Sequence, residues 1–163
     1  MASPAHPADS NLYPNHITWA TRLRAPHFRD ISLGIACLQA LENERKRLGL
    51  SVLAYALLPD HFHIVIAPTN VRVGYIVQCL KLASVHKLMA QGLAGGGLWQ
   101  RQYYEVGLRS PEQVRNVIDY VHNNPAEAGL VSDPVRYPLS SLGVWMEKAT
   151  AVIHIAKSEL SFV

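Results

Sequence analysis

The stretch Pro59–Pro68, PDHFHIVIAP, decides how the rest of this sequence is interpreted. Two histidines separated by one bulky apolar residue lead into a run of β-branched residues, and this pattern predicts a strand. Side chains alternate between the faces of a strand, so His61 and His63 should point the same way, about 7 Å apart. That spacing lets two imidazoles reach one metal ion, while Phe62 and Ile64 face the opposite side. The alternative is a polar strand end with two solvated histidines.

The composition is that of a compact globular protein. The chain has 163 residues, of which 49% are hydrophobic and 17% charged, enough for one domain with a hydrophobic core. A net charge of +3 and a pI near 9.0 hint at a polyanionic partner without establishing one. Cys37 and Cys79 lack CxxC spacing and are expected to be reduced residues of a cytosolic protein. No apolar run approaches the ~18 residues that span a bilayer, so we expect no membrane partner.

Three segments are expected along the chain. Residues 1–12 are rich in Pro and Ala and lack a signal sequence, which predicts a flexible tail. Residues 13–137 should form one domain. Residues 138–163 follow as a C-terminal extension to which the sequence assigns no role.

Apolar periodicity and caps predict the elements of the domain. Strands are expected at 16–21, 51–58, in the histidine stretch and at 98–106, with helices at 31–48, about 72–91 and from 111 onward. Asp30 should cap the first helix and Gly49 should end it. The order β-α-β-β-α-β is the split ferredoxin-like arrangement. We therefore expect an α+β fold, with an antiparallel sheet and an added C-terminal helix.

The third helix has the clearest boundaries. Ser110 should cap it, Pro111 occupies the first helical position, and Gln113 completes a capping box. Pro125 is expected to end it, because the residue before a proline avoids the helical region.

Tyr120 and Asn124 lie one turn apart on this helix, separated by about 40° on a helical wheel. Each alone is typical of a bland role, a core-edge tyrosine and an asparagine that satisfies the end of a helix. Two imidazoles and one amide oxygen, however, suit Mg²⁺ or Mn²⁺ with open coordination positions. Such an ion can bind phosphate oxygens, and a tyrosine hydroxyl beside it could attack a phosphodiester and form a phosphotyrosine.

Several motifs in the same order resemble a known family. The His61–His63 motif, the run Trp99–Glu105 and the run Ile118–Val131 are similar to those of the REP-associated tyrosine transposases. These belong to the single-tyrosine HUH transposases, named after the histidine-hydrophobic-histidine motif. Leu57–Asp60 and Ile76–Lys81 match as well, so the resemblance covers about residues 13–137.

The resemblance implies a site, a reaction and a partner. His61 and His63 match the metal-binding histidines, and Asn124 matches the polar residue that completes the coordination of Mg²⁺ or Mn²⁺. Tyr120 matches the nucleophile, which forms a 5′-phosphotyrosine with single-stranded DNA and releases a 3′-hydroxyl. The implied substrates are REP palindromes, short DNA hairpins flanked by a recognised single-stranded tetranucleotide. We expect a monomer, with a dimer as the alternative, acting in the cytoplasm at the nucleoid.

Basic and aromatic residues near these motifs are further candidates for DNA binding. Related sequences often have a more basic second helix than the one here. Phosphate contacts are expected from Lys81, Lys87, Arg101, Arg109 and Arg115, and base stacking from Trp99, Tyr103 or Tyr104, although each is equally typical of surface or core.

The sequence fits two other kinds of site less well. A two-histidine phosphoesterase needs two His-x-Ser/Thr motifs, and His16–Thr18 qualifies, but His61–His63 lacks the hydroxyl residue. A cupin-like metal site needs more His and Glu ligands on a barrel with many strands. A domesticated protein that binds DNA hairpins without cutting them remains the alternative.

Overall fold

The computed structural model describes residues 12–93 and 97–160, which contain one antiparallel sheet in the order β2-β3-β1-β4. The strands are β1 (Asn15–Ala20), β2 (Val52–Leu57), β3 (His61–Ile66) and β4 (Tyr104–Gly107). The main helices are α1 (Ile31–Leu48), α2 (Val73–Ala90) and α3 (Pro111–Glu127). The remaining helical segments are short. They are Arg22–Arg24 and His27–Arg29 before α1, and Pro134–Arg136, α4 (Leu142–Trp145) and Lys157–Leu160 after α3. This order of elements confirms the ferredoxin-like α+β fold with an added helix.

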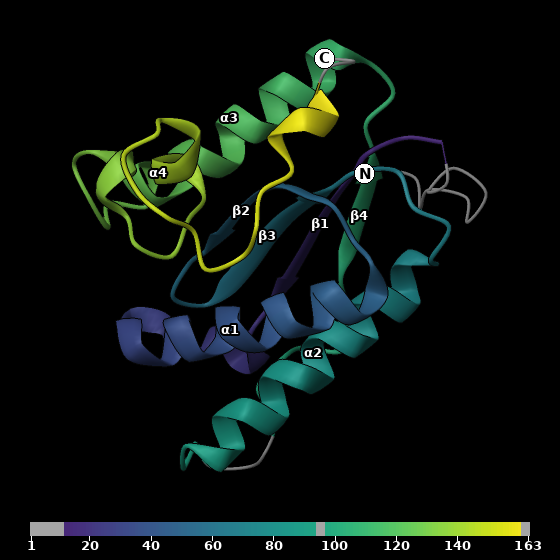
Figure 1. The fold of residues 1–163 in the computed structure, drawn as a ribbon. Coiled ribbons are helices and arrows are strands. Elements are labelled where there is room, and N and C mark those ends of the chain that lie inside the picture. The colour runs from purple at the N-terminus through teal and green to yellow at the C-terminus, as the bar shows by residue number, and fades with distance from the viewer. Residues whose placement is uncertain (1–11, 94–96, 161–163) are drawn as a thin grey trace.

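The sheet separates two apolar layers (Figure 1). Helices α1 and α2 pack against each other and cover one face, which buries Ile17, Phe62 and Ile64. Helix α3 lies on the other face, where Val65 and Ile118 belong to a second cluster. The alternation along β3 therefore sends Phe62, Ile64 and Ile66 toward α1 and α2, and sends His61, His63 and Val65 toward α3.

Local signals set the ends of α1. The Asp30 side chain accepts hydrogen bonds from the backbone N–H groups of Ser32 and Leu33, as an N-cap does. Gly49 adopts the left-handed conformation with φ 66°, and its N–H reaches the carbonyls of the last turn. Both predicted boundaries are confirmed.

The predicted strand at 98–106 was wrong over residues 98–103. Trp99 makes only an isolated bridge with Thr21, and β4 begins at Tyr104. The Lys81 ammonium explains the difference, because it donates to the backbone carbonyls of residues 100, 101 and 102 at 2.8, 3.3 and 3.1 Å. Carbonyls that face a lysine on α2 cannot face a neighbouring strand.

This arrangement predicts the effect of Lys81→Met on stability. Loss of three charge-assisted hydrogen bonds should lower the free energy of unfolding by about 2 kcal/mol. Lys87→Met removes an exposed lysine of the same helix and should change it by less than about 0.5 kcal/mol. Urea unfolding of both variants measures the difference, and equal stabilities would show that the three contacts contribute nothing.

Helix α3 differs from its prediction at both ends. It continues through Pro125 to Glu127, because the proline ring is buried and only the final residues follow it. The main energetic cost of Pro125 in the helix is then the one backbone hydrogen bond that its missing N–H cannot donate. At the start, Ser110 Oγ accepts from the Gln113 N–H at 3.2 Å, but the Gln113 side chain accepts from the N–H of Arg109, one residue earlier than a capping box requires.

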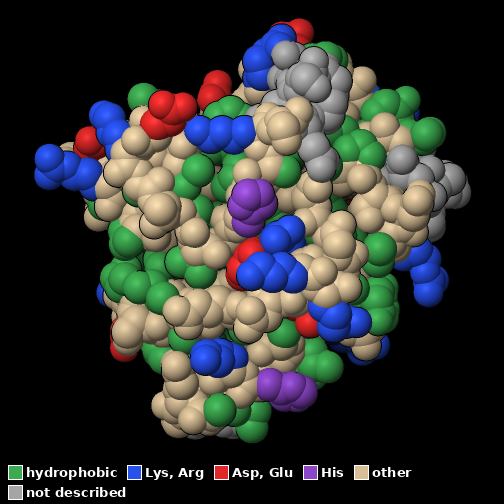
Figure 2. Space-filling view, viewed as in Figure 1, with side chains coloured by type: hydrophobic (Ala, Val, Ile, Leu, Met, Phe, Trp, Pro, Cys, Tyr) green, Lys and Arg blue, Asp and Glu red, His purple; other side chains and the backbone are tan. Residues whose placement is uncertain are grey.

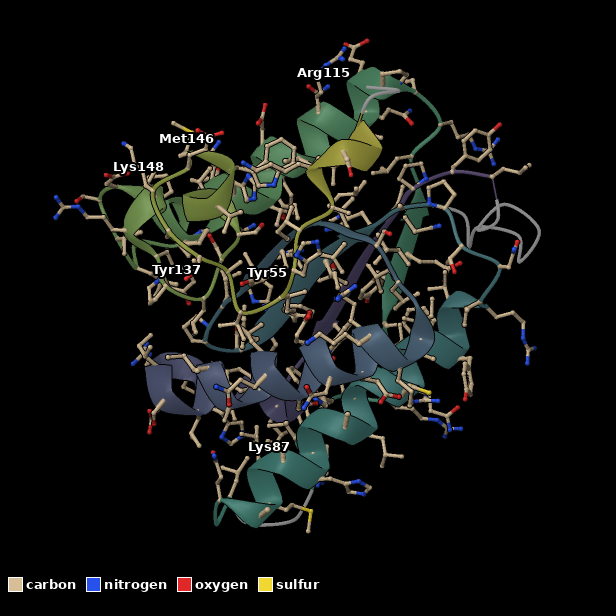
Figure 3. All side chains as sticks on the ribbon, in the orientation of Figure 1. Tyr55, Lys87, Arg115, Tyr137, Met146 and Lys148 are labelled. Carbon is tan, nitrogen blue, oxygen red and sulfur yellow. The ribbon has the colours of Figure 1, made fainter. Side chains whose placement is uncertain are left out.

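The C-terminal extension, which carries Met146 and Lys148 in Figure 3, packs on the outer edge of β2. The backbone carbonyl of Leu139 accepts from the Leu57 N–H at 2.8 Å, and Ile155 forms a parallel bridge with Val52. Leu139 and Ile155 are both buried. The extension therefore protects an edge strand and completes the core.

Two expectations concern the tail and membranes. The tail predicted at residues 1–12 lies outside the described residues, except for Leu12, whose side chain is exposed. Within the described ranges, none of the helices has the length and apolarity required to cross a bilayer.

Candidate functional site

The two histidines of β3 lie on the sheet face that carries α3. His61 pairs with Ala20 and His63 with Thr18 in the antiparallel register with β1. Their ring centroids are 4.9 Å apart with the rings at 80°, so both side chains point to the same face. The predicted orientation is confirmed, and His63 is buried while His61 keeps a partly exposed side chain.

Tyr120 reaches this pair from α3. Its ring centroid lies 5.6 Å from that of His63 and 6.2 Å from that of His16, in edge-to-face contacts. The side chain is 46% exposed, so one side of it contacts the imidazoles and the other meets solvent. The fold thus brings together residues from β1, β3 and α3.

A carboxylate holds His61 in place. Asp60 Oδ1 lies 2.6 Å from His61 Nδ1, and Asp60 Oδ2 lies 3.0 Å from Arg24 Nε. Arg24 and the preceding Leu23 both have φ of 56°, an unusual conformation for residues other than glycine. A carboxylate on Nδ1 keeps the proton there and leaves Nε2 as the nitrogen with the free lone pair.

His63 is contacted at the same ring nitrogen by two side chains of β1. Its Nδ1 lies 3.0 Å from Thr18 Oγ1 and 3.1 Å from His16 Nε2. Its Nε2 is buried and has no hydrogen-bond partner among the described residues. Burial lowers the pKa of His63 to about 3 and that of His16 to about 4, so both imidazoles are neutral at pH 7.

These features fit a divalent metal ion. Each imidazole of the motif has Nδ1 engaged, which leaves Nε2 for an ion, and an imidazole must be neutral to bind a metal. Asn124 lies one turn after Tyr120, and its side chain is 9% exposed. Over residues 12–93 and 97–160, no group of three His, Cys, Asp or Glu side chains is placed to share an ion. The donor set under consideration is therefore two imidazoles and an amide.

Some functional neighbours were missed from the sequence. Asp60 directly precedes His61, and its position before the motif was a readable signal for a carboxylate partner. In the sequence, His16 and Thr18 resemble only a phosphoesterase motif. No neighbouring residue indicates that they contact His63, which lies more than forty residues later. Arg24 offered no signal, because its contact depends on an unusual turn.

Two of the DNA-binding candidates have other roles. Trp99 is 8% exposed, its indole N–H donates to Ser84 Oγ at 2.8 Å, and its ring packs 5.4 Å from that of Phe28. The predicted base stacking by Trp99 was wrong, because its faces are in the core. Lys81 was predicted to contact phosphate, but its ammonium already donates to three backbone carbonyls.

The other candidates remain predictions. Lys87, Arg101, Arg109 and Arg115 are exposed and Tyr103 is partly buried. Lys87 and Arg115 lie on opposite sides of the sheet in Figure 3, so they do not form one basic patch. Figure 2 shows Lys and Arg side chains interspersed with Asp and Glu on the face that it draws. Charge alone therefore does not outline a DNA-binding surface there.

Comparisons with known proteins identify the family. The family model described as "Transposase IS200 like" matches residues 10–124. A Haemophilus influenzae protein, predicted to be a REP-associated tyrosine transposase, is 29% identical over 99 residues, which are 54% of this chain and 56% of that protein. The match thus spans only about half the length of this relative.

Two solved structures share the fold. A REP-associated tyrosine transposase bound to a REP hairpin superposes with a TM-score of 0.72 at 19% identity, covering 96% of each chain. A predicted transposase from Deinococcus radiodurans R1 has a TM-score of 0.51 at 24% identity, covering 67% of this chain and 90% of the other. Because the family match includes most of the chain, with both histidines and Tyr120, the protein belongs to the family of IS200-like transposases.

Proposed function

We propose that the protein cleaves single-stranded DNA beside a hairpin and transfers the cut strand, with Tyr120 as the nucleophile. The observation that carries this proposal is the contact of the half-exposed Tyr120 ring with His63, whose ring lies 4.9 Å from that of His61. A reactive hydroxyl and a pair of metal-binding groups must meet at one phosphate for such a reaction.

The chemical step is a transesterification. The Tyr120 hydroxyl oxygen attacks the phosphorus of a phosphodiester, and the bond from phosphorus to the 3′-oxygen breaks. The tyrosine proton leaves, the departing 3′-oxygen gains one, and the 5′-phosphate stays on the protein. A 3′-hydroxyl from another strand can then attack the phosphotyrosine, which restores the tyrosine and joins the strands without an external energy source.

His61, His63 and Asn124 would hold Mg²⁺ or Mn²⁺ in this site. When bound, the ion supplies Lewis-acid polarisation of the phosphate. Asp60 contacts Nδ1 of His61, and Thr18 and His16 contact Nδ1 of His63, so Nε2 of each imidazole would be the nitrogen that binds the ion.

A REP-like hairpin is the substrate that we propose. The solved structure that covers 96% of this chain is a REP-associated tyrosine transposase bound to a REP hairpin. The Haemophilus relative is predicted to be a transposase of the same class. We propose a monomer acting on such DNA at the nucleoid, with a dimer as the alternative.

The test uses purified protein and an oligonucleotide with a REP-like hairpin and single-stranded flanks. With Mg²⁺ or Mn²⁺ we expect cleavage and a slower-migrating covalent adduct on a denaturing gel, and EDTA should remove both. Hairpin binding without an adduct in either metal would overturn cleavage and favour a protein that binds hairpins only.

A further inference from the structure

The sheet face that carries the site is covered unevenly. Helix α3 packs mainly against β2 and less against β3. Strand β4 forms the opposite edge of the sheet, and its Tyr104 and Val106 are 75% and 41% exposed. The β4 end of this face therefore presents an aromatic ring and an apolar side chain to solvent.

Strand register places Tyr104 in line with the site. Tyr104 pairs with Thr18 on β1, and Thr18 pairs with His63 on β3, so the three side chains share one face and one row. Two strand spacings put the Tyr104 Cα about 10 Å from the His63 Cα. A stacked strand rises ~3.4 Å per nucleotide, so roughly two or three nucleotides span this distance.

The chemistry of the ring favours a nucleic-acid base as its partner. A tyrosine on an edge strand buries little area and stabilises the fold little when it is 75% exposed. Four-stranded sheets of this architecture bind single strands by stacking bases on aromatic residues of an uncovered face. Such stacking accepts any base, because every base has a π-face.

Resting on the proposed function, we infer that Tyr104 is a stacking platform for an unpaired base of the DNA that flanks the hairpin. The base would lie on the β4 edge while the adjacent backbone leads to the phosphate beside Tyr120. Val106 extends the apolar floor, and the Arg109 guanidinium, which lies over the Tyr13 ring at 5.8 Å, adds positive charge beyond the end of the strand. The platform thus determines where the single strand lies, and Tyr104 acts as a positioning residue.

The test separates binding of the flank from binding of the hairpin. Tyr104→Ala should weaken affinity for a hairpin with a single-stranded flank by about 10-fold, with affinity for the hairpin alone unchanged. Tyr104→Phe keeps the ring and should retain the affinity. A 2-aminopurine base in the flank should have its fluorescence quenched when it stacks on the ring. This quenching should be present with wild type and Tyr104→Phe and absent with Tyr104→Ala. Tyr75→Ala, which removes an exposed tyrosine from α2, is the matched control and should behave as wild type.

The outcomes also distinguish this inference from the proposed function. Flank binding that depends on Tyr104 in a protein that never cleaves would support the platform and overturn the cleavage. Cleavage by wild type with unchanged flank affinity and quenching in Tyr104→Ala would overturn the platform alone. A change from dimer to monomer in Tyr104→Ala, seen by light scattering without DNA, would identify the face as a protein interface and also overturn it.

Discussion

Replacing Tyr120 with phenylalanine should abolish the covalent protein–DNA adduct and slow cleavage by at least about 1,000-fold. The substitution removes one hydroxyl and keeps the ring that contacts His63 and His16. Metal binding and hairpin affinity should therefore remain. A denaturing gel with end-labelled DNA measures the adduct, and fluorescence anisotropy measures the affinity.

Tyr104→Phe is the matched control, because it removes a hydroxyl from a tyrosine on the sheet face that carries α3. We expect it to form the adduct at the wild-type level. An adduct that persists in Tyr120→Phe and disappears in Tyr104→Phe would reassign the nucleophile. Loss of hairpin affinity in Tyr120→Phe would show that the hydroxyl serves binding.

Replacing His61 with alanine should reduce cleavage by at least about 100-fold and leave hairpin affinity nearly unchanged. The imidazole contributes to the metal site, whereas phosphate and base contacts elsewhere supply most of the binding energy.

Asp60→Asn removes the charge that holds His61 Nδ1 and should weaken Mn²⁺ binding by about 10- to 100-fold. Calorimetric titration with Mn²⁺ in the absence of DNA measures this effect apart from catalysis.

His86→Ala is the control for these variants, since His86 is an exposed histidine on α2. It should retain both cleavage and metal affinity. Parallel loss of cleavage and hairpin affinity in His61→Ala would mean that the histidine forms part of the DNA surface. Unchanged Mn²⁺ affinity in the same variant would remove His61 from the metal site.

The regular parts of the fold were predictable because their signals are local. Asp30 and Gly49 mark the ends of α1 through caps that depend on neighbouring residues alone. The irregular run before β4 was not predictable, because its carbonyls face Lys81, about twenty residues earlier in the chain. The end of α3 was missed because burial of Pro125 outweighs the local preference of the residue before a proline.

The site was predictable only in part, because some of its contacts join residues that are distant in sequence. Alternation along a strand places His61 and His63 on one face, and the family resemblance supplied Tyr120 and Asn124. Asp60 lies beside His61 in the sequence, but His16, Thr18 and Arg24 lie on β1 and in the turn after it, and only the fold brings them close. Trp99 was misassigned because its partners, Ser84 and Phe28, are distant in sequence.

The most direct test of the account is the location of the covalent bond. After reaction with the hairpin oligonucleotide and nuclease trimming, trypsin separates the candidate tyrosines, because Tyr120 is the single tyrosine between Arg115 and Arg136, whereas Tyr103 and Tyr104 lie between Arg101 and Arg109. Tandem mass spectrometry should find the nucleotide on the peptide spanning 116–136, attached to Tyr120. A nucleotide on the peptide spanning 102–109, or cleavage that leaves no nucleotide on any tyrosine, would contradict it.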